Sequence, residues 1–199
     1  MQKIYILILV LLAPLFILAA EPTLPATNFS TVFMQGNSFT VNFSKGNGTS
    51  RIAVMKKGSA VTARPQSGNS YLSSSTFGNG QELAPGELVV YVSSGAAFPV
   101  YSLVPDAEYH LAIFEFNGSG INTEFLTSSF LAGTASTLSK PTVQPTNFIA
   151  SNITGNNVTL SWQAGDGTSM LVLAKRGGPV NANPVELTSY NANSRVGYL

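Results

Sequence analysis

Cysteine is absent from this 199-residue chain, and charge of either sign is scarce. Without cysteine there can be no disulfide, no thiolate metal site and no lipid-modified N-terminal cysteine. Ten Lys and Arg residues stand against nine Asp and Glu residues, and charged residues make up only 10% of the sequence. This balance provides neither a basic field for nucleic acid nor an acidic field, so we expect no nucleic-acid partner.

Histidine and aspartate are also scarce, which limits catalytic and metal-binding chemistry. The only histidine is His110, and nothing in the sequence assembles the nucleophile and orienting acid of a serine-hydrolase triad around it. Asp106 and Asp166 are the only aspartates, and neither lies in a calcium-loop spacing. Gly46-x-Gly48 and Gly78-x-Gly80 precede no helical pattern, so we interpret them as turns rather than phosphate-binding loops. We therefore predict no catalytic residue, no cofactor and no metal, and not an enzyme.

The N-terminus has the pattern of a secretory signal peptide. Lys3 precedes an apolar run from Ile4 to Ala20 that ends in small residues. We predict cleavage after Ala20 and a protein that is secreted or held at the cell surface. The alternative is an uncleaved anchor, because the run is at the short end of what spans a bilayer. In that case this segment would be the only membrane contact.

The remaining chain alternates short apolar stretches with turns rich in Gly, Ser, Thr and Asn. Residues 38–44 show strict alternation, and residues 51–57 are apolar on both faces, as in a central strand. Residues 58–85 contain little strand pattern. Further strands are expected at residues 27–33 (an edge), 87–92, 98–103, from Tyr109 onward and 128–136. About seven short strands separated by turns predict an all-β, immunoglobulin-like β-sandwich.

A structural corner is predicted between residues 103 and 109. Pro105 has no N–H and a fixed φ, so it ends a ladder and turns the chain after Leu103. Tyr109 then begins a strand, and its hydroxyl is in position to bond a backbone group a few residues upstream. We interpret Leu103, Pro105 and Tyr109 as a tyrosine corner and not as catalytic groups.

The sequence also repeats itself. Residues 140–199 align with residues 21–80 without a gap, at a constant shift of 119, and about a third of the paired residues are identical. Matching stretches include Gly48-Thr-Ser with Gly167-Thr-Ser, and Pro65 and Tyr71 with Pro184 and Tyr190. This self-similarity predicts two copies of one structural unit. Within the second copy we expect strands at residues 158–162 and 170–175.

Both copies resemble the fibronectin type III-like tandem repeats of large secreted and cell-surface bacterial proteins. The residues that match the family pattern are Gly48, Lys56, Gly58, Val61, Pro65, Gly68, Tyr71, Phe77, Gly78, Leu103, Pro105, Tyr109, Glu115, Phe116, Asn117 and Gly118. After the signal peptide at residues 1–20, the repeat and the resemblance together predict a first domain at 21–138 and the first half of a second at 139–199. The resemblance implies no reaction, because this fold serves many functions.

One face of the strand after Tyr109 is a candidate interaction surface. His110, Phe114 and Phe116 share the side opposite Leu111, and aromatic rings on a sheet face can stack on sugars. We favour the interpretation that residues 58–85 fold over this face, with Tyr71 or Phe77 covering the rings, because large apolar patches are rare on soluble monomers.

The sequence supports three hypotheses for function. The first is a non-catalytic spacer or adhesion module of a larger secreted protein, monomeric, with an unknown surface protein or glycan as partner. The second is the accessory region of a secreted hydrolase whose catalytic domain lies beyond Leu199. The third is a carbohydrate-binding module that uses the aromatic face. We also expect that residues 140–199 need further strands in order to fold.

Overall fold

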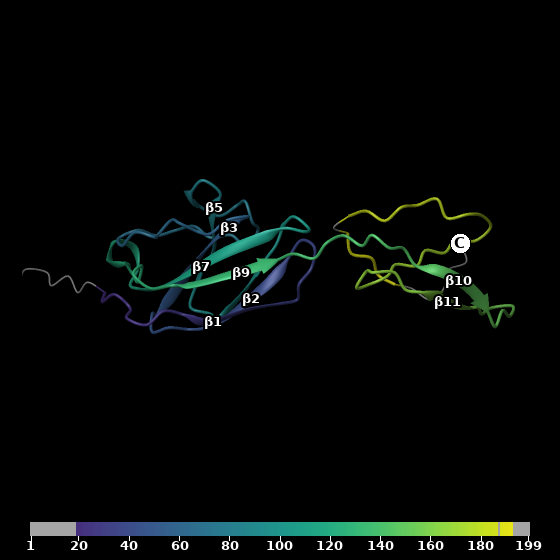
Figure 1. The fold of residues 1–199 in the computed structure, drawn as a ribbon, viewed down its shortest axis with the longest axis horizontal. Helices are drawn as coiled ribbons and strands as arrows, with labels where there is room; N and C mark the ends of the chain where they lie inside the picture. The colour runs from purple at the N-terminus through teal and green to yellow at the C-terminus, as the bar shows by residue number, and fades with distance from the viewer. Residues whose placement is uncertain (1–18, 187, 193–199) are drawn as a thin grey trace, which may run out of the picture.

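The computed structural model describes residues 19–186 and 188–192, so the predicted signal segment, residues 1–18, lies outside the described residues. The described chain is built of β-strands with one short 3-10 helix, η1 (Gly120–Asn122) (Figure 1). The first unit contains β1 (Thr27–Val32), β2 (Phe39–Ser44), β3 (Ser50–Lys57), β4 (Glu82–Ala84), β5 (Glu87–Ser93), β6 (Ala97–Val100), β7 (Glu108–Asn117), β8 (Glu124–Phe125) and β9 (Leu131–Ser136). The second unit contains β10 (Thr146–Ser151) and β11 (Thr159–Gln163).

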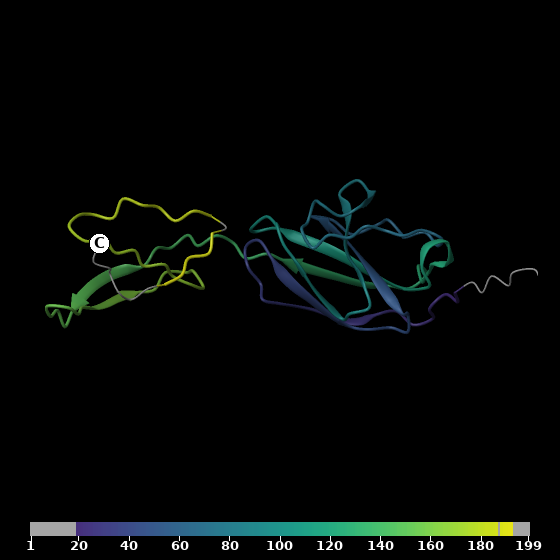
Figure 2. The same cartoon turned by 180° about the vertical axis from the view of Figure 1, so that it is seen from behind.

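The first unit is a sandwich of two antiparallel sheets. One sheet has the order β1-β2-β6, and the other has the order β4-β5-β3-β7-β8, with β9 also paired to β7. Strands β3 and β7 pair over eight positions, from Ser50 opposite Phe116 to Lys57 opposite Tyr109. Figures 1 and 2 show the two layers from opposite sides. The fold is the predicted immunoglobulin-like, fibronectin type III-like β-sandwich.

The main core lies between the two sheets. Because side chains alternate along a strand, every second residue of β7 points inward, beginning with the fully buried Tyr109. The residues that fill this core are Ala26, Phe39, Val41, Phe43, Ala53, Met55, Val90, Phe98, Val100, Leu103, Tyr109, Leu111, Ile113 and Ala135. The ring of Phe77 packs on Tyr109, with ring centroids 5.2 Å apart.

A second core lies on the outer face of the larger sheet. Ile52 and Val54 of β3 and Ala112 and Phe114 of β7 are buried there, which explains why β3 is apolar on both faces. The chain covers them with Val61, Tyr71 and Leu83 from residues 58–85, and with Phe125 and Phe130 from the segment after β7. The expectation that residues 58–85 cover this face is therefore right for Tyr71, whereas Phe77 packs in the main core.

Both open sides of the first sandwich are closed by local contacts. On one side, residues 72–81 run from β5 to the end of β6, where Thr76 and Tyr101 form a parallel bridge. On the other side, the ring of Phe29 in β1 packs directly on Gly133 in β9, which leaves no room for a side chain at that position. These contacts shield sheet edges that would otherwise be free to pair with other chains.

In the first unit, the strand predictions differ from the structure in short elements and in strand bounds. The short elements β4, β8 and η1 were not expected, because two or three residues carry no readable periodicity. The expected strand at 98–103 ends at Val100, after which the backbone of Tyr101 pairs with residues 75–77 instead of β2. The expected strand at 128–136 begins only at Leu131.

The second unit reproduces the first two strands of the sandwich. In β1 and β2, Thr27 lies opposite Ser44, and in β10 and β11, Thr146 lies opposite Gln163, a shift of 119 on both sides of the pair. A register irregularity follows at the corresponding place in each pair. The expected strand at residues 170–175 is wrong, because no strand is assigned there. Its counterpart β3 is held by β5 and β7, and the described part of the second unit contains no strand equivalent to either.

Candidate functional site

The corner residues form a tight structural cluster. The hydroxyl of Tyr109 accepts a hydrogen bond from the backbone N–H of Val104 at 2.9 Å. Leu103 is buried, and Thr137 ties the corner to the end of β9 by donating its hydroxyl to the Val104 carbonyl at 2.7 Å. Asp106, next to Pro105, has a φ of 53°, as expected for a residue in a sharp turn. The hydroxyl of Tyr109 thus helps to hold the turn.

The candidate interaction face of His110, Phe114 and Phe116 is not an exposed aromatic surface. Phe114 is fully buried beneath Phe130, and the guanidinium of Arg64 lies 4.2 Å from the centre of the Phe130 ring. His110 lies at the other end of β7, where its Nε2 is 2.7 Å from a carboxylate oxygen of Glu108. Phe116 and His110 both remain partly open, at opposite ends of β7. The three residues do not form one continuous exposed surface, because Phe114 in the middle of the shared face is covered.

Gly46 and Gly48 enclose a buried carboxylate that belongs to the protein itself. The backbone N–H groups of Gly46 and Gly48 donate to the two oxygens of Glu115 at 2.9 and 3.1 Å. A side chain at either glycine would collide with Glu115. The turn therefore binds an anion, as glycine-rich turns can, but its anion is internal.

Arg51 completes this buried network. Its Nη2 lies 2.9 Å from Oε2 of Glu115 and its Nε lies 3.2 Å from Oε1, so the two side chains meet in a two-point contact. The remaining guanidinium N–H groups donate to the carbonyls of Gly48, Ser94 and Gly95. The residue type of Arg51 does not predict its burial, because charged residues are rarely buried. The only indication is that Arg51 lies in a strand that is apolar on both faces.

A second buried carboxylate, Glu87, lies at the start of β5. It accepts hydrogen bonds from Lys56 Nζ at 3.0 Å, from the Thr62 hydroxyl at 2.7 Å and from the backbone N–H groups of Thr62 and Ala63. Burial alone would raise the pKa of Glu87. The hydrogen bonds, led by that from Ala63, outweigh burial and lower the pKa from 4.5 to about 2. Glu87 therefore fixes residues 61–63 to the outer face of the sheet.

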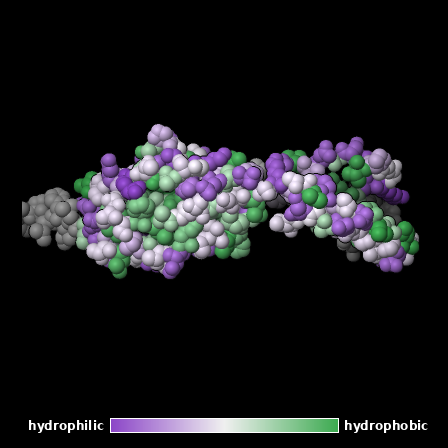
Figure 3. All heavy atoms as spheres, in the orientation of Figure 1, coloured by the Kyte–Doolittle hydropathy of each residue, from purple (hydrophilic) through white to green (hydrophobic). Residues whose placement is uncertain are grey.

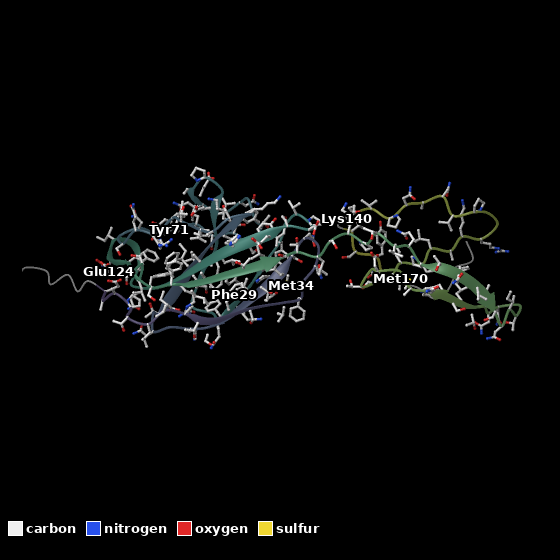
Figure 4. All side chains as sticks on the ribbon, in the orientation of Figure 1. Phe29, Met34, Tyr71, Glu124, Lys140 and Met170 are labelled. Atoms are coloured by element: carbon white, nitrogen blue, oxygen red, sulfur yellow. The ribbon has the colours of Figure 1, made fainter. Side chains whose placement is uncertain are left out.

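One concave feature of the first unit is a small cavity of about 210 Å³ at the end of β7. Its walls carry three aromatic rings, those of Tyr71, Phe116 and Phe125. The centroid of the Phe125 ring lies 4.9 Å from that of Phe116 and 5.8 Å from that of Tyr71. The other lining residues are Ile52, Asn69, Ser70, Val92, Gly118, Ser119, Gly120 and Thr123. We call this feature the aromatic pocket. Figure 4 shows Tyr71 and Glu124 at the end of the first unit that lies away from Lys140.

A wider cavity of about 580 Å³ lies at the joint between the two units. Gln35, Pro105 and Leu138 line it from the first unit, and Asp166 and Thr188 line it from the second. The Asp166 carboxylate already accepts hydrogen bonds from the backbone N–H groups of Thr142 and Val143, which lower its pKa. This cavity therefore offers no unsatisfied charge from Asp166.

The described residues contain neither a metal-binding cluster nor a membrane-spanning helix. Within residues 19–186 and 188–192 there is no group of three or more His, Asp or Glu side chains placed to hold a metal ion. No helix in the same part of the chain has the length and apolar character needed to cross a membrane.

Comparisons with known proteins concern the fold alone. No protein-family model and no curated protein matches this chain. Among solved structures, a computationally redesigned β-sandwich protein is 13% identical with a TM-score of 0.39, over 58% of this chain and 95% of that one. A fibronectin type III domain of human collagen XX is 14% identical with a TM-score of 0.35, over 60% and 96%. A two-domain fibronectin type III segment of chicken tenascin is 13% identical with a TM-score of 0.35, over 69% and 61%. The fold assignment itself rests on the strand order and register described above.

Proposed function

We propose that this chain is a non-catalytic module of a larger secreted or surface protein, in which repeated β-sandwiches act as spacers or adhesive units. The observation that carries the proposal is the agreement in detail between the two units. A chain that builds one local structure twice at a fixed interval has the organisation of a repeat array, whose stability and length grow unit by unit.

The agreement extends from strand register to single side chains. Asn47 accepts hydrogen bonds from the N–H groups of Thr23 and Leu24, and Asp166 accepts the equivalent bonds from Thr142 and Val143. Tyr71 accepts from Gln66 N and Tyr190 accepts from Val185 N, each at 2.7 Å. Positive φ angles recur in the pairs Asn28 and Asn147, Phe33 and Asn152, and Gly58 and Gly177. All of these pairs are 119 residues apart.

The charged groups of the first unit also favour a structural role. Glu115 and Glu87 are buried with their hydrogen-bonding capacity directed to backbone N–H groups and to Arg51 and Lys56. Carboxylates that accept backbone hydrogen bonds in this way fix the neighbouring loops. A general acid or base needs its pKa near the working pH, and the pKa of Glu87 is about 2.

The proposal requires that the chain is exported and that its signal peptide is removed. The full chain, expressed in a bacterial host, is fractionated and the N-terminus of each form is sequenced. We expect the protein outside the cytoplasm, beginning at Glu21. An intact chain that begins at Met1 and stays in the cytoplasm would contradict secretion, and an intact chain in the membrane fraction would indicate an anchor.

A different class of function is the accessory region of a secreted hydrolase. Both proposals require the same fold, so the reading frame beyond Leu199 separates them. Further units with the 119-residue interval support the spacer, whereas a catalytic signature supports the hydrolase. Small-angle scattering of the exported chain adds a second measurement, because a spacer requires the two units to lie end to end as in Figure 1.

A further inference from the structure

We propose that the aromatic pocket binds a single neutral sugar ring. This inference goes beyond the spacer role, since a spacer needs no ligand. It also differs from a carbohydrate surface on the middle of β7, because Phe114 is buried and takes no part.

The pocket has the chemistry that a sugar ring requires. Aromatic rings pack against the C–H faces of sugars, and the rings of Tyr71, Phe116 and Phe125 line the pocket. Hydroxyl and amide groups at the rim can bond the sugar hydroxyls. The rim hydroxyls of Ser70 and Ser119 form no hydrogen bond within the described structure, and both residues are exposed. Their bonding capacity is thus available to a ligand.

Charge and size select the kind of sugar. None of the eleven lining side chains is charged, so an ionic ligand would be desolvated without a partner. The volume of about 210 Å³ lies below the roughly 300–1,000 Å³ of pockets that hold drug-sized ligands. A single uncharged ring fits this combination, with the rest of a glycan extending into solvent.

The pocket is formed before any ligand arrives. Gly118 and Gly120 have positive φ values of 80° and 57°, and Thr123 donates its hydroxyl to the Gly120 carbonyl at 2.8 Å, which fixes the rim. The opposite wall is tied to this rim, because Gly68 N donates to the Thr123 carbonyl at 2.8 Å. A pre-organised site loses less entropy on binding.

The pocket belongs to the first unit alone. Tyr190 of the second unit corresponds to Tyr71 and has the equivalent hydrogen bond. The partners of Tyr71 come from β7 and β8, and the described second unit contains no equivalent of these strands. Ligand binding must therefore affect the first unit only.

The test is an amide-shift titration of the uniformly ¹⁵N-labelled exported chain. The probes are maltotriose, cellotriose and N-acetylchitotriose, with a trimer of galacturonic acid as the charged comparison. We expect at least one neutral probe to shift amides of residues 67–71 and 118–125 and to leave residues 140–192 unchanged. No shift with any neutral probe, or stronger binding of the acidic trimer, would overturn the proposal.

Matched variants separate binding from folding. Ser119→Lys blocks the rim at an exposed residue, and Ser59→Lys places the same side chain at the opposite end of β7, next to Gly58, which bonds Glu108. We expect Ser119→Lys to weaken binding about tenfold or more and Ser59→Lys to leave it unchanged. Tyr71→Phe keeps the ring and should keep binding, whereas Tyr71→Ala should lose it. Equal binding by Ser119→Lys and Ser59→Lys, or shifts of the pocket amides by an aromatic tripeptide and by no sugar, would show that the pocket is not a sugar site.

Discussion

Arg51 and Glu115 lie directly opposite each other on β3 and β7 and form a two-point ion pair that is almost fully buried. Removing one partner of such a pair leaves an uncompensated charge, which costs about 3–5 kcal/mol, whereas apolar replacement of both is far better tolerated. The second unit carries Met170 at the position of Arg51. We therefore expect Glu115→Leu to destabilise the first unit more than the double variant Arg51→Met with Glu115→Leu.

The double variant should still be less stable than the parent chain. Glu115 also accepts hydrogen bonds from Gly46 and Gly48, and each orphaned N–H costs about 1–3 kcal/mol where water cannot reach it. Urea unfolding of the three proteins measures both differences. A double variant no more stable than Glu115→Leu would show that the ion pair is not the main contribution of Glu115.

The corner makes a separate prediction for Tyr109. Tyr109→Phe removes the acceptor of the Val104 N–H and should lower the free energy of unfolding by about 1–3 kcal/mol. Leu103→Ala should cost about 2–5 kcal/mol, because it opens a cavity in the main core. Tyr71→Phe is the control, since it loses a similar bond from Gln66 at an exposed site. Equal unfolding midpoints for Tyr109→Phe and Tyr71→Phe would show that the hydrogen bond of the corner does not stabilise the first unit.

Glu87 makes stability depend on pH in the acid range. Its pKa is about 2 in the folded chain against an ordinary 4.5, so the ionised form is favoured by folding. That stabilisation is fully present above pH 4.5 and is lost as the pH falls toward 2, by about 1–3 kcal/mol. Glu87→Gln should be less stable than the parent at pH 7. The difference in free energy of unfolding between the two proteins should become smaller as the pH falls toward 2. A difference in melting temperature between the two proteins that stays constant from pH 7 to pH 2 would contradict the ionised role of Glu87.

Much of the fold could be predicted from the sequence, because periodicity reports which faces of a strand are buried. Alternation in residues 38–44 and the two apolar faces of residues 51–57 correctly predict β2 and β3. The buried ion pair and the aromatic pocket could not be predicted in this way. Arg51 and Glu115 are 64 residues apart in the sequence, and Tyr71 and Phe125 are 54 residues apart, so only the tertiary structure brings each pair together. The error at residues 170–175 has the same origin, since an apolar stretch becomes a strand only beside a partner.

Gly133 allows a test of how β1 and β9 close the sandwich. A side chain at Gly133 would collide with the ring of Phe29, so Gly133→Ala must displace that ring from the edge of the core. We expect a loss of about 1–3 kcal/mol, typical of overpacking. Gly36→Ala is the control, because its new carbon would lie 3.5 Å from the Leu138 carbonyl oxygen, an ordinary contact. If Gly133→Ala costs less stability in a Phe29→Ala background than in the parent chain, the collision with the Phe29 ring is the cause of the loss.

The two units should differ sharply in stability when they are separated. In the first unit, Phe39, Ile52 and Phe114 are at most 1% exposed. In the second unit the apolar side chains that match core positions stay open, with Trp162 37%, Leu171 42% and Leu173 39% exposed. Figure 3 shows apolar side chains at the surface of the second unit among hydrophilic ones.

An element with so much exposed apolar surface gains little from folding alone, and even a complete 60-residue domain buries only about 60% of its surface. Its open strand edges also favour pairing with other chains. We therefore expect residues 21–139 to melt cooperatively as a monomer, and residues 140–199 to show neither a cooperative transition nor a dispersed amide spectrum. Thermal melts, amide spectra and sedimentation of both pieces provide the comparison. A cooperative melt with well-dispersed amides from residues 140–199 would mean that β10 and β11 are stabilised by contacts within that piece, and that the strands equivalent to β5 and β7 are not needed.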